Sequence, residues 1–568
     1  MKRAVPRRAF AAGAASILGL IGVMSLSGGL AGGAPAKGPS QHVLLISIDG
    51  FHQSDLTQCV ANNECPNLAS LEGFGTSYTN ANTSEPSDSA PGTMALLTGA
   101  SPKLSGVYYD DSYDRTMYKP AAQEPSGTQN CTGPAGAETM FAENVDVGAP
   151  TASVASGTRP ILNARLDATQ FPYVKQSGKC SPVAPNDFLR NNSAMSVAHQ
   201  AGLRTAWADK HPVYNAQVAG HGTPNSVSDP FNTEINADLI PPTLVDTRGR
   251  TVTFPLPNAD GTGPYFITDS VGDTEAYDQI KVDAILNEID GRTSANTLAA
   301  PVPAIFGMNF QAVSVGQKLV DPLQSCIRVP SPTCNPSYVP GGYEHGTLQF
   351  TPQLNGAIQF VDGAIGSMVT ELRNQGVLGS TTIIVTAKHG QSPIDPSLLD
   401  KVGHAEVNVL AAAGITPAQV TDDDISLIWL QDQSQTAAAV AALEADKAGP
   451  NTAKVDYILS GSALAKQFNS PLSEPRTPDL IVQPVPGTIY SSSKAKVMEH
   501  GGFAEDDTHV AMLVVNGANM VAGNQINATV ATPVRTYQVA PTILADLGLN
   551  PGKLDSVRIE HVQVLPAR

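Results

Sequence analysis

The sequence predicts a doubly wound α/β protein with a mostly parallel sheet, helices on both faces and two insertions. One observation is a set of short apolar runs bounded by Gly or polar residues, such as 42–48 and 381–387. These runs are typical of central parallel strands, which are buried on both faces. A second observation is the helical spacing of apolar residues over 354–372, which predicts a long amphipathic helix. Strand, helix and strand repeated at this distance favour a parallel sheet.

The same two patterns predict the remaining elements. Further strands are expected over 205–208, 304–310, 425–430 and 510–515, and shorter helices over 194–201, 280–289 and 437–445. A closing helix is expected over 542–547, because Gly548 follows it and Pro541 is tolerated in a first helical turn. The sequence shows no internal repeat and no coiled-coil pattern.

We expect an N-terminal targeting signal followed by one large domain. Residues 1–36 are interpreted as a signal peptide and residues 37–568 as the α/β domain. Two stretches look inserted: 112–300, which is rich in Pro, Gly, Asn and Thr, and 393–495, which contains the Ala-rich helix and is expected to form a smaller lobe.

The N-terminus has the order of a secretory signal. Basic residues precede a mild apolar stretch over 9–33, and small residues follow it. Arg7-Arg8-Ala9-Phe10 resembles a twin-arginine signal. We therefore expect a secreted or periplasmic protein, with an uncleaved lipid or membrane anchor as the alternative. No later segment reaches about 18 uncharged apolar residues, so the mature chain should have no membrane span.

Six cysteines agree with export, because disulfides persist in oxidising compartments. Six cysteines allow about 15 pairings. We expect Cys59–Cys65, Cys131–Cys180 and Cys326–Cys334. None of the cysteines has the CxxC spacing of a zinc site.

The charge balance excludes one class of partner. Lys and Arg number 34 against 51 Asp and Glu, which gives a net charge of −17. Binding to nucleic acid depends on basic residues that neutralise phosphates. The composition therefore argues against a nucleic-acid duplex or an anionic membrane as the main partner, and it does not predict an oligomeric state.

Polar residues follow two of the predicted strands. Asp49 comes directly after 42–48, and Lys388 and His389 come after 381–387. Ligands bind at the carboxyl ends of parallel strands, so these residues are expected to be neighbours in a site. The alternative is that Asp49 caps the following helix and His389 is an ordinary loop histidine.

Ser89 begins a predicted apolar helix after a turn at 85–93. Backbone N–H groups and the helix dipole at such a position favour a phosphoryl group. The alternative is that Ser87, Asp88 or Ser89 is an ordinary N-cap.

Four short motifs follow one another along the chain. They are Asp49-Gly50, the turn at 85–93 before Leu97-Thr98-Gly99, Thr386-Ala387-Lys388-His389-Gly390, and Glu499-His500-Gly501. In this order they resemble the alkaline phosphatase superfamily, closest to its type I phosphodiesterase/nucleotide pyrophosphatase branch. Asp88-Ser89-Ala90 also looks like the nucleophile tripeptide of alkaline phosphatases. The resemblance covers about residues 42–550 and implies an alkaline-phosphatase-like fold.

The resemblance also implies a bimetallic site and a covalent phosphoseryl intermediate. Ser89 falls at the nucleophile position. Asp49 and His389 fall on ligands of the metal that activates the nucleophile, and His500 falls on a ligand of the partner metal. The implied substrate is a small phosphate ester or a nucleotide-like molecule.

The sequence departs from the family at three places. Lys388 replaces a metal carboxylate, Val313–Gln317 lacks the Asp and the His of another motif, and Asp110 aligns with a phosphate-binding Asn. We therefore expect one divalent ion or an atypical set, with zinc favoured. Lys388 is expected to pair with Asp49 and to act as an electrostatic catalytic helper.

Several other residues are candidate ligands. Asp209 and His211 follow the predicted strand over 205–208, and Arg476 is expected either to clamp a phosphate or to pair with Asp479. Loop residues that could supply replacement metal ligands are His221, Asp229, Glu344, His345 and His509, and the alternative for each is an ordinary solvated loop residue.

The leading hypothesis is an exported phosphoric-ester hydrolase, of the phosphodiesterase or nucleotide pyrophosphatase kind, that acts through Ser89. The alternative from another class is a non-catalytic ligand-binding protein on the same fold, because metal ligands are lost. A transferase or a hydrolase of another ester, such as sulfate, is a third option. The position of Ser89 disfavours a classical sulfatase, which uses a cysteine-derived group.

Overall fold

The structure is a computed structural model that describes residues 40–140, 159–258, 266–320 and 340–567. The described residues belong to one compact unit, Pro39–Arg568. The predicted signal peptide and the predicted Cys326–Cys334 bond lie outside the described residues.

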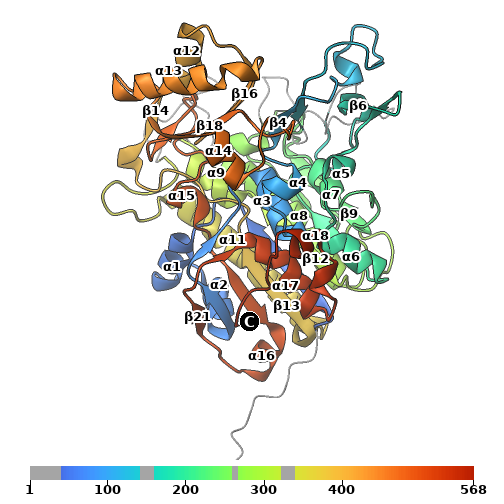
Figure 1. Cartoon of the computed structure of the whole chain (residues 1–568). Coiled ribbons are helices and arrows are strands. Elements are labelled where there is room, and N and C mark those ends of the chain that lie inside the picture. The colour runs from blue at the N-terminus through green and yellow to red at the C-terminus, as the bar shows by residue number, and fades with distance from the viewer. Residues whose placement is uncertain (1–39, 141–158, 259–265, 321–339, 568) are drawn as a thin grey trace, which may run out of the picture. The chain divides into compact units, whose positions relative to one another are not determined.

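A central sheet organises this unit (Figure 1). In the described residues it has eight strands, in the order β21-β2-β20-β13-β1-β12-β8-β9. Their bounds are β21 Ala528–Val530, β2 Gly75–Tyr78, β20 Leu513–Asn516, β13 Thr381–Thr386, β1 His42–Ile48, β12 Ile305–Phe310, β8 Ala206–Ala208 and β9 Asp229–Phe231.

Strands β13, β1, β12, β8 and β9 run parallel to one another, whereas β20 is antiparallel to both β13 and β2. The predicted mostly parallel α/β fold is confirmed. The carboxyl ends of β1, β8, β12 and β13 share one edge of the sheet, and the residues that follow these strands meet there.

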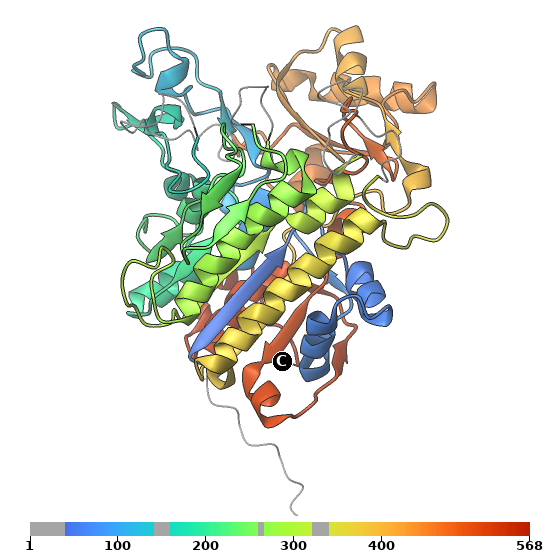
Figure 2. The same ribbon diagram turned by 180° about the vertical axis from the view of Figure 1, so that it is seen from behind.

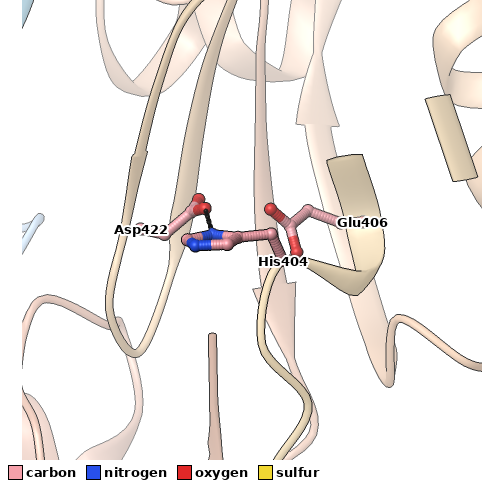
Figure 3. Close-up of side chains that lie close together, drawn as sticks. All are labelled: His404, Glu406 and Asp422. Carbon is pink, nitrogen blue, oxygen red and sulfur yellow. Dashed lines mark hydrogen bonds and ion pairs between the residues drawn. The ribbon is translucent and has the colours of Figure 1, made fainter. Parts of the chain in front are cut away.

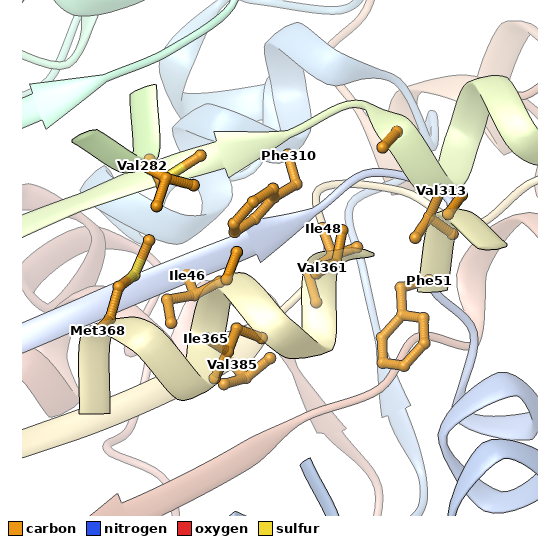
Figure 4. Close-up of a cluster of buried hydrophobic side chains, with 14 of the residues drawn as sticks. Ile46, Ile48, Phe51, Val282, Phe310, Val313, Val361, Ile365, Met368 and Val385 are labelled. Carbon is orange, nitrogen blue, oxygen red and sulfur yellow. The ribbon is translucent and has the colours of Figure 1, made fainter. Parts of the chain in front are cut away.

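The two faces of the sheet are covered by different helices, and β1 contributes to both cores. Leu44, Ile46 and Ile48 pack with α8 (Val271–Ile289) and α11 (Pro352–Asn374) in the cluster drawn in Figure 4. Figure 2 shows these two long helices running across the same face. Val43 and Leu45 point the other way because side chains alternate along a strand. Their partners lie on α3 (Ser89–Thr98), α6 (Ala194–Gln200) and α17 (Val539–Asp546).

The remaining short elements connect these layers. The helices are α1 Gln53–Ala61, α2 Pro66–Phe74, α4 Pro102–Ser105, α5 Pro185–Phe188, α7 Pro212–Gln217, α9 Ala312–Lys318, α15 Glu505–Thr508, α16 Gly517–Ala522 and α18 Asp555–Ile559. The paired strands outside the central sheet are β3 Ala81–Asn82 with β22 Val534–Arg535, β4 Asp111–Asp114 with β5 Ala137–Met140, β6 Tyr173–Gln176 with β7 Lys179–Pro182, and β10 Thr243–Val245 with β11 Thr251–Thr253.

The two stretches predicted as insertions behave differently. Part of 112–300 belongs to the central layers, since β8, β9 and α8 lie within it. Residues 393–495, here called the lobe, have an antiparallel sheet of their own in the order β15-β16-β18-β17. The predicted strand over 425–430 is part of this second sheet. Its elements are β14 Asp400–Lys401, β15 Pro417–Asp422, β16 Ser426–Leu430, β17 Val455–Ser460, β18 Leu480–Pro484, β19 Thr488–Ile489, α12 Ala405–Ala412, α13 Thr436–Ala448 and α14 Gly461–Gln467.

Two of the predicted disulfides are confirmed, Cys59–Cys65 and Cys131–Cys180. Among the described residues, the helices are too short or too polar to cross a membrane.

Candidate functional site at the carboxyl edge of the sheet

Ser89 is the first residue of α3, which points its N-terminus at the carboxyl edge of the sheet. Asp88 caps the helix, because its Oδ2 accepts the N–H of Ala90 at 3.0 Å. Gly92 lets α3 approach β13 closely, since a Cβ at this position would lie 2.3 Å from the carbonyl oxygen of Lys388. The local sequence therefore places the Ser89 hydroxyl beside the residues that follow β13.

The four residues of the predicted site lie together. Ser89 Oγ is 3.3 Å from His389 Nε2, which in turn is 3.4 Å from Asp49 Oδ2. The rings of His389 and His500 are 4.0 Å apart between centroids. Asp49, Ser89 and His389 are fully buried, and His500 is 9% exposed. The convergence expected from strand ends and motif order is thus observed.

Lys210 is the residue of this site that the sequence reasoning overlooked. Its Nζ donates to Ser89 Oγ at 2.7 Å and lies 3.7 Å from Asp49 Oδ2. The carboxylates Asp49 and Asp88 outweigh the effect of burial and raise the pKa of the Lys210 ammonium. The available signal was its position one residue beyond Asp209, at the end of β8.

The expected ion pair between Lys388 and Asp49 is not formed. Lys388 Nζ instead bonds Asp209 Oδ1 at 2.6 Å, and both side chains are fully buried. Asp209 reaches Lys388 because β8 ends at the same edge as β13, and the indole N–H of Trp207 donates to its other oxygen at 2.9 Å. Burial lowers the pKa of Lys388, although Asp209 and Asp49 oppose that effect.

Asp49 is surrounded by donors. Its Oδ2 accepts amide N–H bonds from Gln311 and, at 3.3 Å, from Asn309. Burial raises the pKa of Asp49, but the adjacent imidazole of His389 and the ammonium of Lys388 outweigh it and hold this pKa well below the ordinary value. Asp49 is therefore a carboxylate whose Oδ2 already serves several partners.

Asp88 and His500 form the opposite side of the site. His500 Nδ1 is 3.7 Å from Asp88 Oδ1, and the backbone N–H of Asp110 donates to Asp88 Oδ2 at 3.0 Å. Burial raises the pKa of Asp88. Burial and the neighbouring His389 lower the pKa of His500 well below its ordinary value. His500 is therefore a neutral imidazole at pH 7.

Asp49, His389 and His500 do not form a convergent set of three ligands in the described chain, although Asp49 Oδ1 and His500 Nδ1 are buried without hydrogen-bond partners there. Within the described residues, one group of at least three donor residues has ligand atoms all within 4.8 Å of one another, and it does not contain Asp49, His389 or His500. Gln317, which the resemblance places at a ligand position, turns its amide to the carbonyl of Gly50 at 2.9 Å and to Tyr343. The described residues at this edge therefore give no complete three-ligand set for either of the two ions that the resemblance implies.

The group of donors that does converge lies in the lobe (Figure 3). It consists of His404, Glu406 and Asp422. His404 Nδ1 is 2.9 Å from Asp422 Oδ2. Glu406 is fully buried, and its Oε2 has no hydrogen-bond partner among the described residues.

The other candidate residues are engaged away from Ser89. His211 Nδ1 is 2.8 Å from Glu234 Oε1. Arg476 bonds Asp114 Oδ2 at 2.9 Å and the carbonyl of Phe188 at 2.7 Å, so the alternative pairing with Asp479 is not formed. Three of the suggested replacement ligands have other partners: His221 contacts the carbonyl of Leu189, Asp229 pairs with Arg204, and His509 pairs with Glu505. Glu344 and His345 are exposed.

Comparison with known proteins gives a family and a fold. The sequence matches the model of type I phosphodiesterase / nucleotide pyrophosphatase over residues 43–289 and 340–509, more than half of the chain. No curated protein matches it. Wild-type alkaline phosphatase PafA is similar in structure, with a TM-score of 0.53 and 13% identity over 91% of this chain and 97% of that chain.

Two other solved structures are similar at a TM-score of 0.49. One is an inactive variant of murine ectonucleotide pyrophosphatase / phosphodiesterase 5 in complex with AMP, at 13% identity over 90% of this chain and 96% of that one. The other is phosphonoacetate hydrolase from Sinorhizobium meliloti 1021 in complex with phosphonoformate, at 15% identity with the same coverage.

Proposed function

The chain belongs to the type I phosphodiesterase / nucleotide pyrophosphatase family, and on this basis we propose that it is an exported phosphodiesterase with Ser89 as its nucleophile. The family and the fold support a phosphoester hydrolase. Two disulfides are consistent with an extracytoplasmic protein.

The observation that carries the proposal is the position of the Ser89 hydroxyl between a base and a cation. His389 Nδ1 is 2.8 Å from the carbonyl of Gly390, an arrangement that assigns the proton to Nδ1 and leaves Nε2 as the acceptor facing Ser89. On the other side, Lys210 donates to Ser89 Oγ. A base and a neighbouring cation are the two groups that activate a serine.

The reaction follows from these roles. Ser89 Oγ forms a bond to phosphorus as its proton passes to His389 Nε2, and the bond to the leaving oxygen breaks. The leaving alkoxide takes a proton from water, which leaves hydroxide. Hydroxide then attacks the phosphoseryl ester, and the departing Ser89 oxygen recovers its proton from His389. One water is consumed in the cycle, and Lys210 stabilises the negative charge on oxygen in both steps.

The charge of the site favours a singly charged phosphodiester over a doubly charged monoester. Two lysine ammonium groups, Lys210 and Lys388, face the carboxylates Asp49 and Asp209. Each pair is close to neutral, so the site has little surplus positive charge to hold a phosphate dianion. Lys210 and His500 are partly exposed, with 12% and 11% of the side chain accessible, and a small substrate would enter on their side.

The test is hydrolysis of bis(p-nitrophenyl) phosphate by the purified chain. Ser89→Ala should abolish turnover and the covalent adduct seen by intact-protein mass spectrometry after an acid quench. Ser47→Ala is the matched control, because Ser47 is equally buried and its hydroxyl has no hydrogen-bond partner among the described residues. Equal rates for the wild type and Ser89→Ala would contradict the proposal.

The loss of the family's metal carboxylate at Lys388 supports the competing hypothesis, a binding protein without catalysis. It predicts no turnover of phosphodiesters, phosphomonoesters or sulfate esters by the wild type. Binding of a phosphate ester by calorimetry, with no turnover, would establish that second function.

A further inference from the structure

We propose that the Lys210 ammonium replaces the metal ion that would activate Ser89, and that hydrolysis needs no ion at Asp49 and His389. This inference rests on the proposed function. It begins with the place of Lys210 Nζ, 2.7 Å from Ser89 Oγ and 3.7 Å from Asp49 Oδ2. A zinc ion shared by these two oxygens would need about 2.0–2.2 Å to each, and it would compete with the ammonium for both of them.

One oxygen of Asp49, Oδ2, is already in use, whereas Oδ1 is buried without a hydrogen-bond partner among the described residues. Asp49 Oδ2 accepts from Gln311 and Asn309, and His389 Nε2 lies 3.4 Å away. An ion at this oxygen would have to displace these amide donors as well as Lys210. Asp49 Oδ2 is therefore a hydrogen-bonded oxygen that holds an ammonium, and an ion that left Lys210 in place could bind Asp49 only through Oδ1.

Lys388 and Asp209 position Lys210. Their ion pair is fully buried and ties the end of β8 to the end of β13. Asp209 Oδ1 also accepts the backbone N–H of Lys210 at 2.8 Å. The ring of Tyr214 lies below both ammonium groups, at 4.7 Å from Lys388 Nζ and 6.0 Å from Lys210 Nζ. The lysine that replaced a metal ligand therefore supports the lysine that touches the nucleophile.

The experiment measures turnover of bis(p-nitrophenyl) phosphate before and after chelation in a His404→Ala background, which removes the lobe cluster. Residual metal is measured by plasma mass spectrometry. We expect the rate to survive chelation and to be unaffected by added zinc. Lys210→Ala should lower kcat by about 10²–10³-fold, the loss typical of one oxyanion donor, and Lys210→Arg should restore part of it.

Lys103→Ala, at an exposed lysine on α4, is the matched control and should keep the rate. Loss of turnover on chelation with recovery on adding zinc would overturn the inference. A wild-type rate in Lys210→Ala would overturn it as well. Circular dichroism of each variant separates a catalytic loss from misfolding.

Failure of the proposed function gives a different pattern, namely no turnover by any version of the chain. Zinc titration by calorimetry then decides the inference alone. We expect the His404→Ala variant to bind no zinc. Adding Lys210→Ala and Lys388→Asp to this variant should create zinc binding. Zinc binding that Asp49→Asn abolishes would overturn the inference.

A separate observation carries a second inference: the geometry points to a zinc-type site at His404, Glu406 and Asp422 in the lobe. Their ligand atoms all lie within 4.8 Å of one another. One imidazole and two carboxylates are a donor set that zinc accepts. Burial and the neighbouring Asp422 raise the pKa of Glu406 to about 9, and a divalent ion is a cation that would allow both carboxyl groups to ionise.

The buried Glu406 is the independent support for an ion. Its side chain is fully buried, and its Oε2 lacks a hydrogen-bond partner in the described part of the chain. An unpartnered buried carboxylate oxygen is costly unless a ligand satisfies it. His404 has 66% of its side chain exposed, which gives an ion access from solvent.

The ion would brace the turn after β15. Asp422 ends β15, and the backbone N–H of Asp424, two residues on, donates to the carbonyl of His500 at 3.3 Å. A bound ion would therefore stabilise the segment that contacts the His500 loop without touching Ser89.

Calorimetry with Zn²⁺ on the chelated full chain tests this site. We expect one zinc per chain, a higher melting temperature with zinc, and weaker binding of Ca²⁺, which prefers oxygen ligands. Glu406→Gln and His404→Ala should lose the binding, whereas His345→Ala, at another exposed histidine, should keep it. Absence of zinc binding by the wild type, or equal binding by Glu406→Gln, would overturn the inference.

Discussion

The carboxyl edge around Ser89 and the cluster in the lobe contain the same kinds of side chain. They differ in that a lysine ammonium lies among the side chains at the edge, whereas the lobe cluster is proposed to bind a metal ion. At the edge, Asp49 and His389 face the Lys210 ammonium, and their ligand atoms do not form a convergent set of three. In the lobe, His404, Glu406 and Asp422 converge. Their ion-pair partners in the described chain do not include a lysine or an arginine. The residues that the family resemblance places at a metal site therefore differ from the residues whose geometry suits a metal ion.

Removing one member of the buried pair at the edge should have the largest effect on stability. Lys388→Met leaves Asp209 as an uncompensated buried charge, which costs about 3–5 kcal/mol of unfolding free energy. Urea unfolding measures this loss. The double variant Lys388→Met with Asp209→Leu should recover most of it, because replacing both partners removes the buried charge.

Lys454→Met is the control for this comparison. Lys454 pairs with Asp400 at 2.8 Å, but both side chains are about half exposed. Exposed pairs contribute about 0–1 kcal/mol. Equal losses for Lys388→Met and Lys454→Met would show that the buried pair does not organise the edge.

Asp424 and Asp507 form another buried group of carboxyl side chains, and we expect this pair to share a proton. Burial raises the pKa of Asp507 to about 8, and burial beside Asp507 also raises the pKa of Asp424. A carboxyl group whose pKa is higher in the folded chain than in the unfolded chain stabilises the fold at low pH. This contribution is lost as pH rises from about 4 to about 8. Asp507→Asn should therefore lose less stability between pH 5 and pH 9, by about 1–3 kcal/mol.

Chemical unfolding at both pH values checks this expectation. Other buried carboxyls, such as Glu288 with its pKa raised by burial to about 8, contribute equally to wild type and variant. The difference between the two pH dependences therefore isolates the Asp424–Asp507 pair. Parallel pH curves would contradict the account of this pair.

The smallest expected effect is on substrate charge. With ammonium groups in place of divalent ions, kcat/KM for bis(p-nitrophenyl) phosphate should exceed that for p-nitrophenyl phosphate by about tenfold, which is about 1.4 kcal/mol. Steady-state kinetics at pH 8, where the monoester is a dianion, measure the ratio. A preference for the monoester would indicate more positive charge at the edge than Lys210 and Lys388 supply.

The sequence predicted the parts of the fold that depend on local pattern. The apolar run of β1 and the helical spacing of α11 identified the centre of the fold, and motif order brought Asp49, Ser89, His389 and His500 together. Strand direction was beyond this reasoning, since β20 has the same apolar pattern whether parallel or antiparallel.

The cations at the edge could not be assigned from the sequence for a physical reason. The pairing of Lys388 with Asp209 depends on β8 lying beyond β12 in the sheet, and that order is set by long-range packing. Lys210 is a single lysine after a short strand, with no spacing that indicates contact with Ser89. The lobe cluster joins residues from α12 and β15, whose antiparallel surroundings were not predicted.

Anomalous diffraction at the zinc edge from crystals soaked with zinc and vanadate tests the central claim most directly. The account predicts a zinc peak at His404, Glu406 and Asp422, and vanadate on Ser89 with Lys210 against its oxygens and no peak at Asp49. Zinc bound by Asp49 and His389 beside the vanadate would contradict it.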